Sequence, residues 1–177
     1  MMLSYPYTPK RLDAVREILG FVQDSAEEYR RRGLLLRVGP MPEHAAVEID
    51  PTGLRSILTN ILDKSAKYKE KDVGTASLRA EEDGGTFRLF LDDDGPGVPE
   101  EALPRLFDVF YRSDPARRDP NRGSGLDLLA IVQKTAARMG GAVRAEDLPG
   151  GGLRMILEIP LAESAKGENT DETDLDH

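Results

Sequence analysis

Two predicted β-hairpins constrain the fold of this 177-residue chain more than any other feature. Residues 76–81 and 86–92 flank a Glu-Asp-Gly-Gly turn, and residues 142–146 and 153–159 flank a loop with three consecutive glycines. Apolar side chains alternate along the strand at 86–92, which is typical of a strand with one buried face. Hairpins join antiparallel neighbours, so the sequence predicts a sheet that is mostly antiparallel.

Three segments with helical spacing of their apolar side chains accompany these strands. Threonine or aspartate followed by proline marks the first two starts, because the polar side chain caps the helix and proline suits its first position. The helices are expected at residues 8–33, 50–68 and roughly 126–139, with short strands at 34–38 and 46–49. This order predicts an α+β fold, a two-layer α/β sandwich in which about three helices cover one face of a mixed, mostly antiparallel sheet.

Composition excludes several classes of function. The chain has no cysteine, so disulfides and thiolate zinc sites are excluded. No apolar run approaches the roughly 20 residues that cross a bilayer, and the first residues do not resemble a signal peptide, so no direct membrane contact is expected. The net charge of −8 disfavours nucleic-acid binding, because neutralising phosphates needs a basic surface.

The acidic charge is concentrated in residues 163–177. This segment holds six acidic residues and one lysine, and so carries −5 of the total charge. It has almost no apolar side chains, so burial could not offset the entropy cost of ordering it. We therefore expect one domain at residues 1–162 followed by an acidic, disordered tail, for which a role in binding a partner is the alternative.

The predicted helix at residues 50–68 has one polar face. Asn60, Lys64 and Lys67 are spaced at i, i+4 and i+7 and so share this face, with Tyr68 beside them. An amide, two ammonium groups and an aromatic ring could together hold an anion and a planar ring. Taken alone, the same residues are more simply interpreted as a solvated helix face.

Two glycine-containing segments adjoin predicted elements. Asp93, Gly95 and Gly97 come directly after the strand at 86–92. Glycines there let the backbone approach a ligand, and a carboxylate can accept a hydrogen bond from an exocyclic amine such as that of adenine. The Arg-Gly-Ser-Gly-Leu segment at 122–126 leads into the third helix, where free backbone N–H groups favour phosphate. Each segment alone is also compatible with an ordinary turn or loop.

Together, in this order and spacing, the segments resemble the histidine-kinase branch of the gyrase, chaperone and mismatch-repair ATPase superfamily over about residues 10–161. NILDKSAKY resembles the N box, DDDGPGVP the first glycine box, and LFDVFYRSD the F box, which is particular to histidine kinases. RGSGLDLLAIV resembles the second glycine box, and PGGGLRMILEIP the terminal strand with a third glycine motif. The resemblance implies the Bergerat ATP-binding fold and the ATP-binding catalytic domain of a two-component sensor histidine kinase.

The resemblance also implies a role for each matching residue. Asp93 would accept a hydrogen bond from the adenine amine, Asn60 would help to hold Mg²⁺, and Lys67 would reach the phosphates of ATP. Tyr68 would pack near the base, and residues 111–125 would form a mobile lid over the nucleotide. The other nucleotide-binding residues implied by the resemblance are Gly95, Gly97, Arg112, Arg122, Gly123, Ser124, Gly125 and Leu126.

The family resemblance implies in-line transfer of the ATP γ-phosphate, supported by magnesium and positive charge. The implied acceptor is a histidine on a separate dimerisation domain, and a response regulator would receive the signal. His44 lies in a proline-rich loop and His177 is the last residue, so neither has the helical setting of a phosphoacceptor. We therefore expect no catalytic residue in this chain, no autophosphorylation by the chain alone, and a cytoplasmic location as part of a membrane-bound sensor.

Two positions depart from the family pattern. Lys64 stands where the N box has a second asparagine, and lysine has only hydrogen-bond donors and a charge that would repel a metal. Asp127 stands where the second glycine box has a glycine, beside a one-residue insertion, and a carboxylate there disfavours phosphate. We hypothesise that Lys64 and Asp127 approach each other across the phosphate site and lower the affinity for ATP; tolerated variation is the alternative.

These departures leave two functions open in two-component signalling. One is an enzyme fragment that binds ATP and phosphorylates the histidine of its receptor. The other is a nucleotide-impaired, pseudokinase-like module that acts by protein–protein contact. A third alternative, a serine-phosphorylating anti-sigma-factor kinase of the same superfamily, is disfavoured by the F box and the long first helix.

Overall fold

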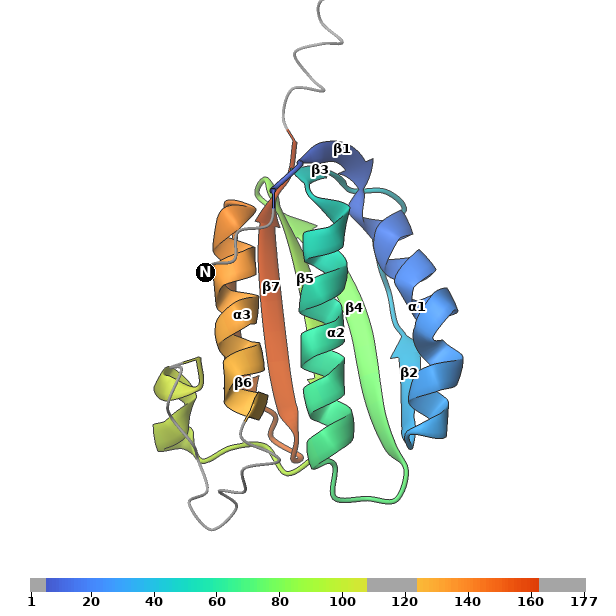
Figure 1. The fold of residues 1–177 in the computed structure, drawn as a ribbon, viewed down its shortest axis with the longest axis vertical. Helices are drawn as coiled ribbons and strands as arrows, with labels where there is room; N and C mark the ends of the chain where they lie inside the picture. The colour runs from blue at the N-terminus through green and yellow to red at the C-terminus, as the bar shows by residue number, and fades with distance from the viewer. Residues whose placement is uncertain (1–5, 108–123, 163–177) are drawn as a thin grey trace, which may run out of the picture.

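Residues 6–107 and 124–162 are described by the computed structural model, without the side chains of residues 124–128. In this part of the chain three helices lie side by side over one face of a five-stranded sheet (Figure 1). The helices are α1 (Ala14–Arg31), α2 (Pro51–Tyr68) and α3 (Ser124–Arg138). The strands of the sheet are β2 (Leu34–Val38), β4 (Gly74–Asp83), β5 (Thr86–Asp93), β6 (Ala142–Asp147) and β7 (Leu153–Pro160).

The sheet is mixed but mostly antiparallel, with the strand order β2-β4-β5-β7-β6. The pairs β4–β5 and β6–β7 are the two hairpins predicted from the sequence, and β5 pairs antiparallel with β7 between them. Among the described strands of this sheet, β2 alone forms a parallel pair, with β4. The predicted two-layer α/β sandwich with a mixed sheet is therefore confirmed.

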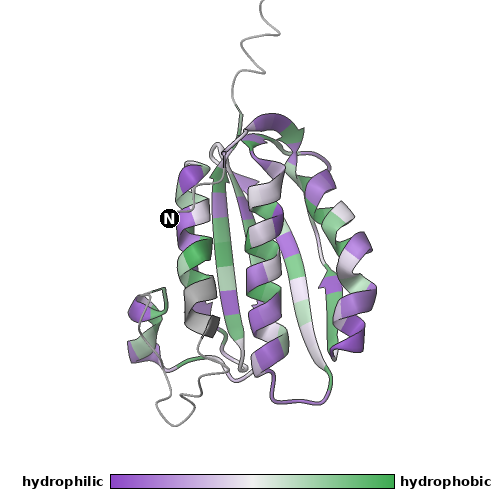
Figure 2. Cartoon of the chain, viewed as in Figure 1, coloured by the Kyte–Doolittle hydropathy of each residue, from purple (hydrophilic) through white to green (hydrophobic). Residues whose placement is uncertain are grey.

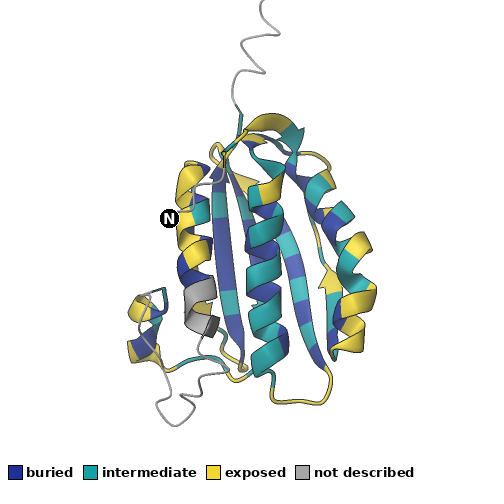
Figure 3. Cartoon of the chain, viewed as in Figure 1, coloured by how far each residue is buried: buried dark blue, intermediate teal, exposed yellow. Residues whose placement is uncertain are grey.

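The sheet packs one face against the helices because its strands alternate in polarity. Leu78 in β4, Leu89 in β5 and Leu157 in β7 are fully buried. Burying each such side chain contributes roughly 1.5–3 kcal/mol. Hydrophobic residues run along the strands while hydrophilic ones collect on α1 (Figure 2), and the strands under the helices are largely buried while α1 carries many exposed residues (Figure 3). The predicted apolar stripe of α2 is buried in the same core: Leu54, Ile57, Leu58, Ile61 and Leu62.

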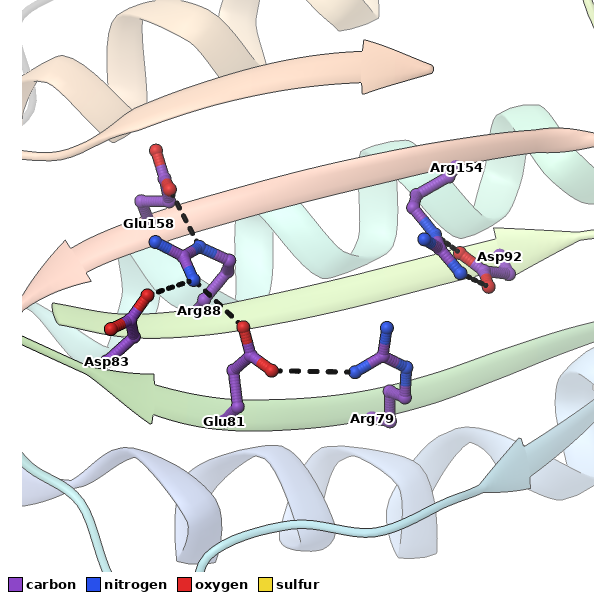
Figure 4. A network of polar contacts seen from close by, with 7 residues as sticks. All are labelled: Arg79, Glu81, Asp83, Arg88, Asp92, Arg154 and Glu158. Atoms are coloured by element: carbon purple, nitrogen blue, oxygen red, sulfur yellow. Dashed lines mark hydrogen bonds and ion pairs between the residues drawn. The ribbon is translucent and has the colours of Figure 1, made fainter. Parts of the chain in front are cut away.

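The opposite face of the sheet is covered by arginine–carboxylate pairs (Figure 4). Arg88 in β5 lies 2.8 Å from Glu81 in β4 and 2.8 Å from Glu158 in β7, so it joins three neighbouring strands. Phe90 is only 7% exposed on this face, because the guanidinium of Arg79 lies 3.9 Å from the centre of its ring. On this face the aromatic ring of Phe90 is therefore covered by charged side chains.

The start of the first helix differs from the prediction. Residues Lys10–Asp13 form strand β1, which pairs antiparallel with β3 (Ala46–Ile49), and α1 begins at Ala14 rather than near Thr8. The side chain of Asp13 caps α1 by accepting a hydrogen bond from an amide of its first turn. Pairing with a strand far along the chain thus outweighs the local threonine–proline signal, which is why the prediction was wrong here.

The other elements begin and end within two residues of their predicted positions. A short 3-10 helix, η1 (Glu100–Arg105), follows β5. None of the described helices is long and apolar enough to cross a membrane. The acidic tail predicted at residues 163–177 lies outside the described residues.

Candidate functional site

Asp92 and Asp93 end β5 and Asp94 follows it, at the end of the sandwich where α2 ends and β7 begins (Figure 1). Side chains alternate across a strand, so Asp93 and Asp92 lie on opposite faces of the sheet. Asp93 points toward the helices, and Asp92 points toward the charged face. Each aspartate has its own partners, and together they fix the local backbone.

The carboxylate of Asp93 accepts three hydrogen bonds. The hydroxyl of Ser65 donates to Oδ2 at 3.0 Å. The backbone amides of Gly95 and Leu153 donate to Oδ1 at 2.9 Å and 3.3 Å. A carboxylate has about four acceptor positions, so these contacts hold it in one orientation and leave Oδ2 able to accept from a further donor.

Ser65 is a site residue that the sequence analysis missed. It lies four residues after Ile61 in α2, so it shares the buried face of this helix and its hydroxyl faces the sheet. A hydroxyl that is partly buried against the sheet is usually hydrogen-bonded. A serine within the apolar stripe of a predicted helix was therefore the signal that could have identified it.

Asp94 ties the end of β5 to the start of β4. Its Oδ1 accepts from the amide of Thr75 at 3.0 Å, and its Oδ2 lies 3.1 Å from the ammonium of Lys71. Partial burial acts to raise the pKa of Asp94, but the hydrogen bonds from Thr75 and Lys71 outweigh it and the pKa is lowered overall. Asp94 is thus kept as an anion that anchors the connection between α2 and β4.

On the charged face, Arg154 grips Asp92 with two parallel hydrogen bonds of 2.8 Å each (Figure 4). The two residues are direct partners in the β5–β7 register. Leu153, the neighbour of Arg154, donates its amide to Asp93, the neighbour of Asp92. The Arg154–Asp92 pair therefore fixes the ends of β5 and β7, where the amide of Leu153 donates to Asp93.

Three glycines let two loops approach each other beside Asp93. A Cβ on Gly152, whose φ is +106°, would overlap the backbone carbonyl oxygen of Asp93. Gly97 has a φ of +77°, and a Cβ there would lie 3.1 Å from the carbonyl oxygen of Gly152. A Cβ on Gly95 would lie 3.3 Å from Oδ1 of Asp93. Gly152 was missed by the sequence analysis, although it belongs to the glycine run that was read as a hairpin loop.

Asn60 and Lys64 lie on the side of α2 that faces α3. Gly53, seven residues before Asn60 on the same face, is so close to α3 that a Cβ on it would lie 3.1 Å from Met139 and 3.3 Å from Thr135. The Asn60 amide nitrogen lies 3.5 Å from the hydroxyl oxygen of a serine one turn earlier. Its carbonyl oxygen could therefore act as an acceptor or ligand toward the α2–α3 side.

Lys64 is partly buried against Tyr68 and near Asp93. Its ammonium nitrogen lies 4.9 Å from the centre of the Tyr68 ring. Burial lowers the pKa of Lys64, and the negative charge of Asp93 offsets part of that shift. The structure therefore brings Lys64, Tyr68 and Asp93 into one electrostatic environment at the end of α2.

Lys67 lies on the part of the polar face of α2 that is nearer to α1. It lines a pocket of about 360 Å³ together with Ala66, Asp63 and Arg32, the last of which follows α1. Asp63 accepts from the hydroxyl of Tyr29 at 2.8 Å and from Arg32 at 2.9 Å. The ammonium nitrogen of Lys67 lies 5.7 Å from the centre of the Tyr68 ring, the same ring that Lys64 contacts. Lys67 is therefore close both to this pocket and to Lys64.

Several predicted site residues fall outside what the structure describes. Arg112, Arg122 and Gly123 are outside the described residues, as is most of the lid predicted at 111–125. The side chains of Ser124, Gly125, Leu126 and Asp127 are likewise not described, although the backbone from Ser124 onward is helical. The hypothesised Lys64–Asp127 contact therefore stays a hypothesis.

Comparison with known proteins places the chain in a family. Residues 49–163 match a family described as histidine kinase-, DNA gyrase B-, and HSP90-like ATPase. The chain is 36% identical over 144 residues to sensor histidine kinase CpxA of Escherichia coli K12, covering 79% of this chain and 30% of that protein. It is 30% identical over 166 residues to the histidine-protein kinase BaeS of the same strain, covering 94% of this chain and 34% of that one. The chain thus spans about a third of the length of these relatives.

Solved structures share the fold. The mycobacterial sensor histidine kinase MprB is 28% identical, with a TM-score of 0.69 over 87% of this chain and 98% of that one. Full-length ShkA in complex with AMPPNP is 27% identical, with a TM-score of 0.70 over 92% of this chain and 32% of that one. Sequence and fold therefore lead to the same group of proteins.

Proposed function

Because the chain belongs to the family of histidine kinase-, DNA gyrase B- and HSP90-like ATPases, in its sensor histidine kinase branch, we propose that it binds ATP beside Asp93 and donates the γ-phosphate to a histidine on a separate dimerisation domain. The structural similarity to ShkA, which was solved in complex with AMPPNP, supports nucleotide binding by this fold. The transfer step and its acceptor rest on the family and on the site geometry described above.

The observation that carries the proposal is the fixed carboxylate of Asp93. Its Oδ2 can accept from the exocyclic amine of adenine while Ser65 donates to the same atom. The glycines at 95, 97 and 152 let two backbone segments pack closely beside this carboxylate, which gives the site a wall of backbone. A pre-oriented acceptor beside such a wall favours adenine over a base that has a carbonyl in place of the amine.

The phosphates would lie toward α3 and the polar face of α2. The first backbone N–H groups of α3, near Ser124, and the helix dipole would favour an anion there. Lys64 and Lys67 at the end of α2 add two positive charges. The predicted Arg112, Arg122 and Gly123 would complete this group, and their contribution remains part of the proposal.

A magnesium ion does not fit the described residues well. Asn60 offers one neutral carbonyl oxygen, but the next residue on its face is the cation Lys64. Within residues 6–107 and 124–162, no group of three or more histidine, cysteine, aspartate or glutamate side chains could hold a metal. The resemblance implied magnesium at Asn60, and Lys64 is the residue that argues against it.

The transfer itself is a substitution at phosphorus. A nitrogen of the acceptor histidine attacks the γ-phosphorus, the bond to the β–γ bridging oxygen breaks, and ADP leaves. His44 of this chain is unsuited to that role, because it is exposed in the loop before β3, where its Nδ1 lies 2.9 Å from Asp13. The acceptor would therefore come from a helical dimerisation domain, with a response regulator as the next partner.

Two measurements test the proposal together. Calorimetric titration with ATP should show binding by the wild-type chain and at least about tenfold weaker binding by Asp93→Asn, since a hydrogen bond to a charged acceptor contributes about 1.5–3 kcal/mol. Asp24→Asn, on the exposed side of α1, is the matched control. Radiolabelled ATP mixed with the chain and the histidine-bearing domain of a sensor kinase such as CpxA should then label the histidine domain.

One observation favours the second function, a module that acts without phosphate transfer. Lys64 places a positive charge near the Asp93 carboxylate, where it could compete with the adenine amine. Binding of ATP without any transfer in the mixed assay would support that module. If neither the wild-type chain nor Lys64→Asn bound ATP, nucleotide binding would play no part in either function.

A further inference from the structure

Lys64 carries an inference that deepens the proposed function and rests on it. We propose that this domain binds ATP as the free nucleotide, not complexed to a divalent metal, and that the ammonium of Lys64 provides the positive charge at the phosphates that a metal would otherwise provide. The ligand class is therefore a metal-free nucleoside triphosphate. Lys64 is the residue that determines this preference.

The position of Lys64 places it on the nucleotide side of α2. It follows Asn60 by one helical turn, and both lie on the face whose earlier residue, Gly53, touches α3. The start of α3 at Ser124 and the end of α2 lie at the same end of the sandwich (Figure 1). A polyanion held at the start of α3 would therefore lie at the end of the sandwich where α2 carries Lys64.

Burial lowers the pKa of Lys64, and the negative charge of Asp93 acts in the opposite direction. The nitrogen lies 4.9 Å from the centre of the Tyr68 ring, a contact that favours the cation. Asp93 is near enough to act on it, yet the hydrogen bonds that Asp93 accepts come from Ser65, Gly95 and Leu153. An incoming polyanion would add negative charge beside Lys64 and so favour its ammonium form.

The same charge works against a divalent ion. A metal ligated by the carbonyl oxygen of Asn60 would lie within about one turn of the Lys64 ammonium, and like charges at that distance repel strongly in a partly buried site. Lysine also has no lone pair with which to ligate a metal while it is protonated. Lys67, whose ammonium lies 5.7 Å from the same Tyr68 ring, adds a second positive charge nearby. Two neighbouring ammonium groups thus suit phosphate oxygens better than they suit Mg²⁺.

The test compares ATP binding with excess EDTA and with saturating magnesium chloride, by calorimetry on the full chain. We expect the wild-type dissociation constant to differ by less than about threefold between the two conditions. Lys64→Asn should acquire magnesium dependence, with at least about tenfold tighter binding when the metal is present. Lys64→Met should weaken binding in EDTA, because it removes the charge and keeps the apolar stem.

Lys134→Asn is the matched control, because it makes the same change at an exposed position in α3 and should behave as wild type. Thermal unfolding of each variant checks that the domain is folded. About tenfold tighter wild-type binding with magnesium would overturn this inference and leave the proposed ATP binding intact. Binding by Lys64→Met but not by wild type would also overturn it, since Lys64 would then block the nucleotide. No ATP binding by any variant in either condition would overturn the proposed function as well.

Discussion

Ser65 in α2 and Asp93 at the end of β5 are joined by one hydrogen bond of 3.0 Å, in which the serine hydroxyl donates to Oδ2 of the aspartate. This bond links the helical layer to the sheet at the place where the candidate site lies. It also sets the orientation of the only carboxylate oxygen of Asp93 that accepts no backbone amide in the described structure. The site therefore depends on how α2 is seated on the sheet.

Ser65→Ala should loosen this link. We expect a loss of about 1 kcal/mol in the free energy of unfolding, the usual net contribution of one hydrogen bond, and a several-fold weaker affinity for ATP because Asp93 loses a fixed orientation. Urea denaturation and calorimetry measure the two effects. Ser25→Ala, the same change in α1, should alter neither. Unchanged ATP affinity in a folded Ser65→Ala variant would show that the Ser65 contact does not serve the site.

Arg154→Met should disturb the site from the other face of the sheet. The variant leaves Asp92, which is about a quarter exposed, without its two 2.8 Å hydrogen bonds, and we expect a loss of about 1–3 kcal/mol in stability. Affinity for ATP should fall too, because Leu153 next to Arg154 donates to Asp93. Arg144→Met removes an exposed arginine of β6 and should change stability by less than about 0.5 kcal/mol. Equal effects of the two substitutions would contradict this account.

Gly152→Ala should be the most damaging small substitution near the site. Its φ of +106° disfavours any side chain, and the added Cβ would overlap the carbonyl oxygen of Asp93. We expect a loss of more than about 2 kcal/mol in the free energy of unfolding. Gly150→Ala, two residues earlier, has open space around its Cβ and should be nearly neutral. Comparable unfolding midpoints for the two variants would show that the loops do not need this close approach.

His44 should make stability depend on pH near neutrality. Its hydrogen bond with Asp13 raises its pKa above the usual 6.5, with Glu43 adding to the rise and Arg16 opposing it. A raised pKa in the folded state means that the stabilising contribution is complete below about pH 6.5 and is lost as the pH rises through the raised value. Urea denaturation from pH 5 to 8 should show this decline in wild type and a flatter profile in His44→Gln. Parallel profiles would refute the assignment.

The hairpins and the second helix were predictable from the sequence because their signals are local. Alternation along 86–92, the glycine turn before it, and the aspartate–proline pair before α2 each act within a few residues. Strand β1 was missed because its partner, Ala46–Ile49, lies far along the chain, and local patterns carry no information about such pairing.

The candidate site was predictable in part for the same reason. Asp93, Gly95 and Asn60 stand in motifs that can be read along the chain. Ser65 could have been noticed as a polar residue within an apolar stripe, but its partner Asp93 could not, because that contact depends on how α2 is rotated over the sheet. The role of Arg154 could not be assigned, because it depends on the β5–β7 register. The Lys64–Asp127 contact hypothesised from charge alone remains untested, whereas the electrostatic influence of Asp93 on Lys64 emerged only from the fold.

The most direct test of the central claim compares ATP with inosine triphosphate by calorimetry on the wild-type chain. Inosine has a carbonyl oxygen where adenine has an amine, so it cannot donate to the carboxylate of Asp93 and would place two acceptors against each other. We predict that ATP binds and that inosine triphosphate binds at least about tenfold more weakly. Equal affinity for the two nucleotides would contradict recognition of adenine by Asp93.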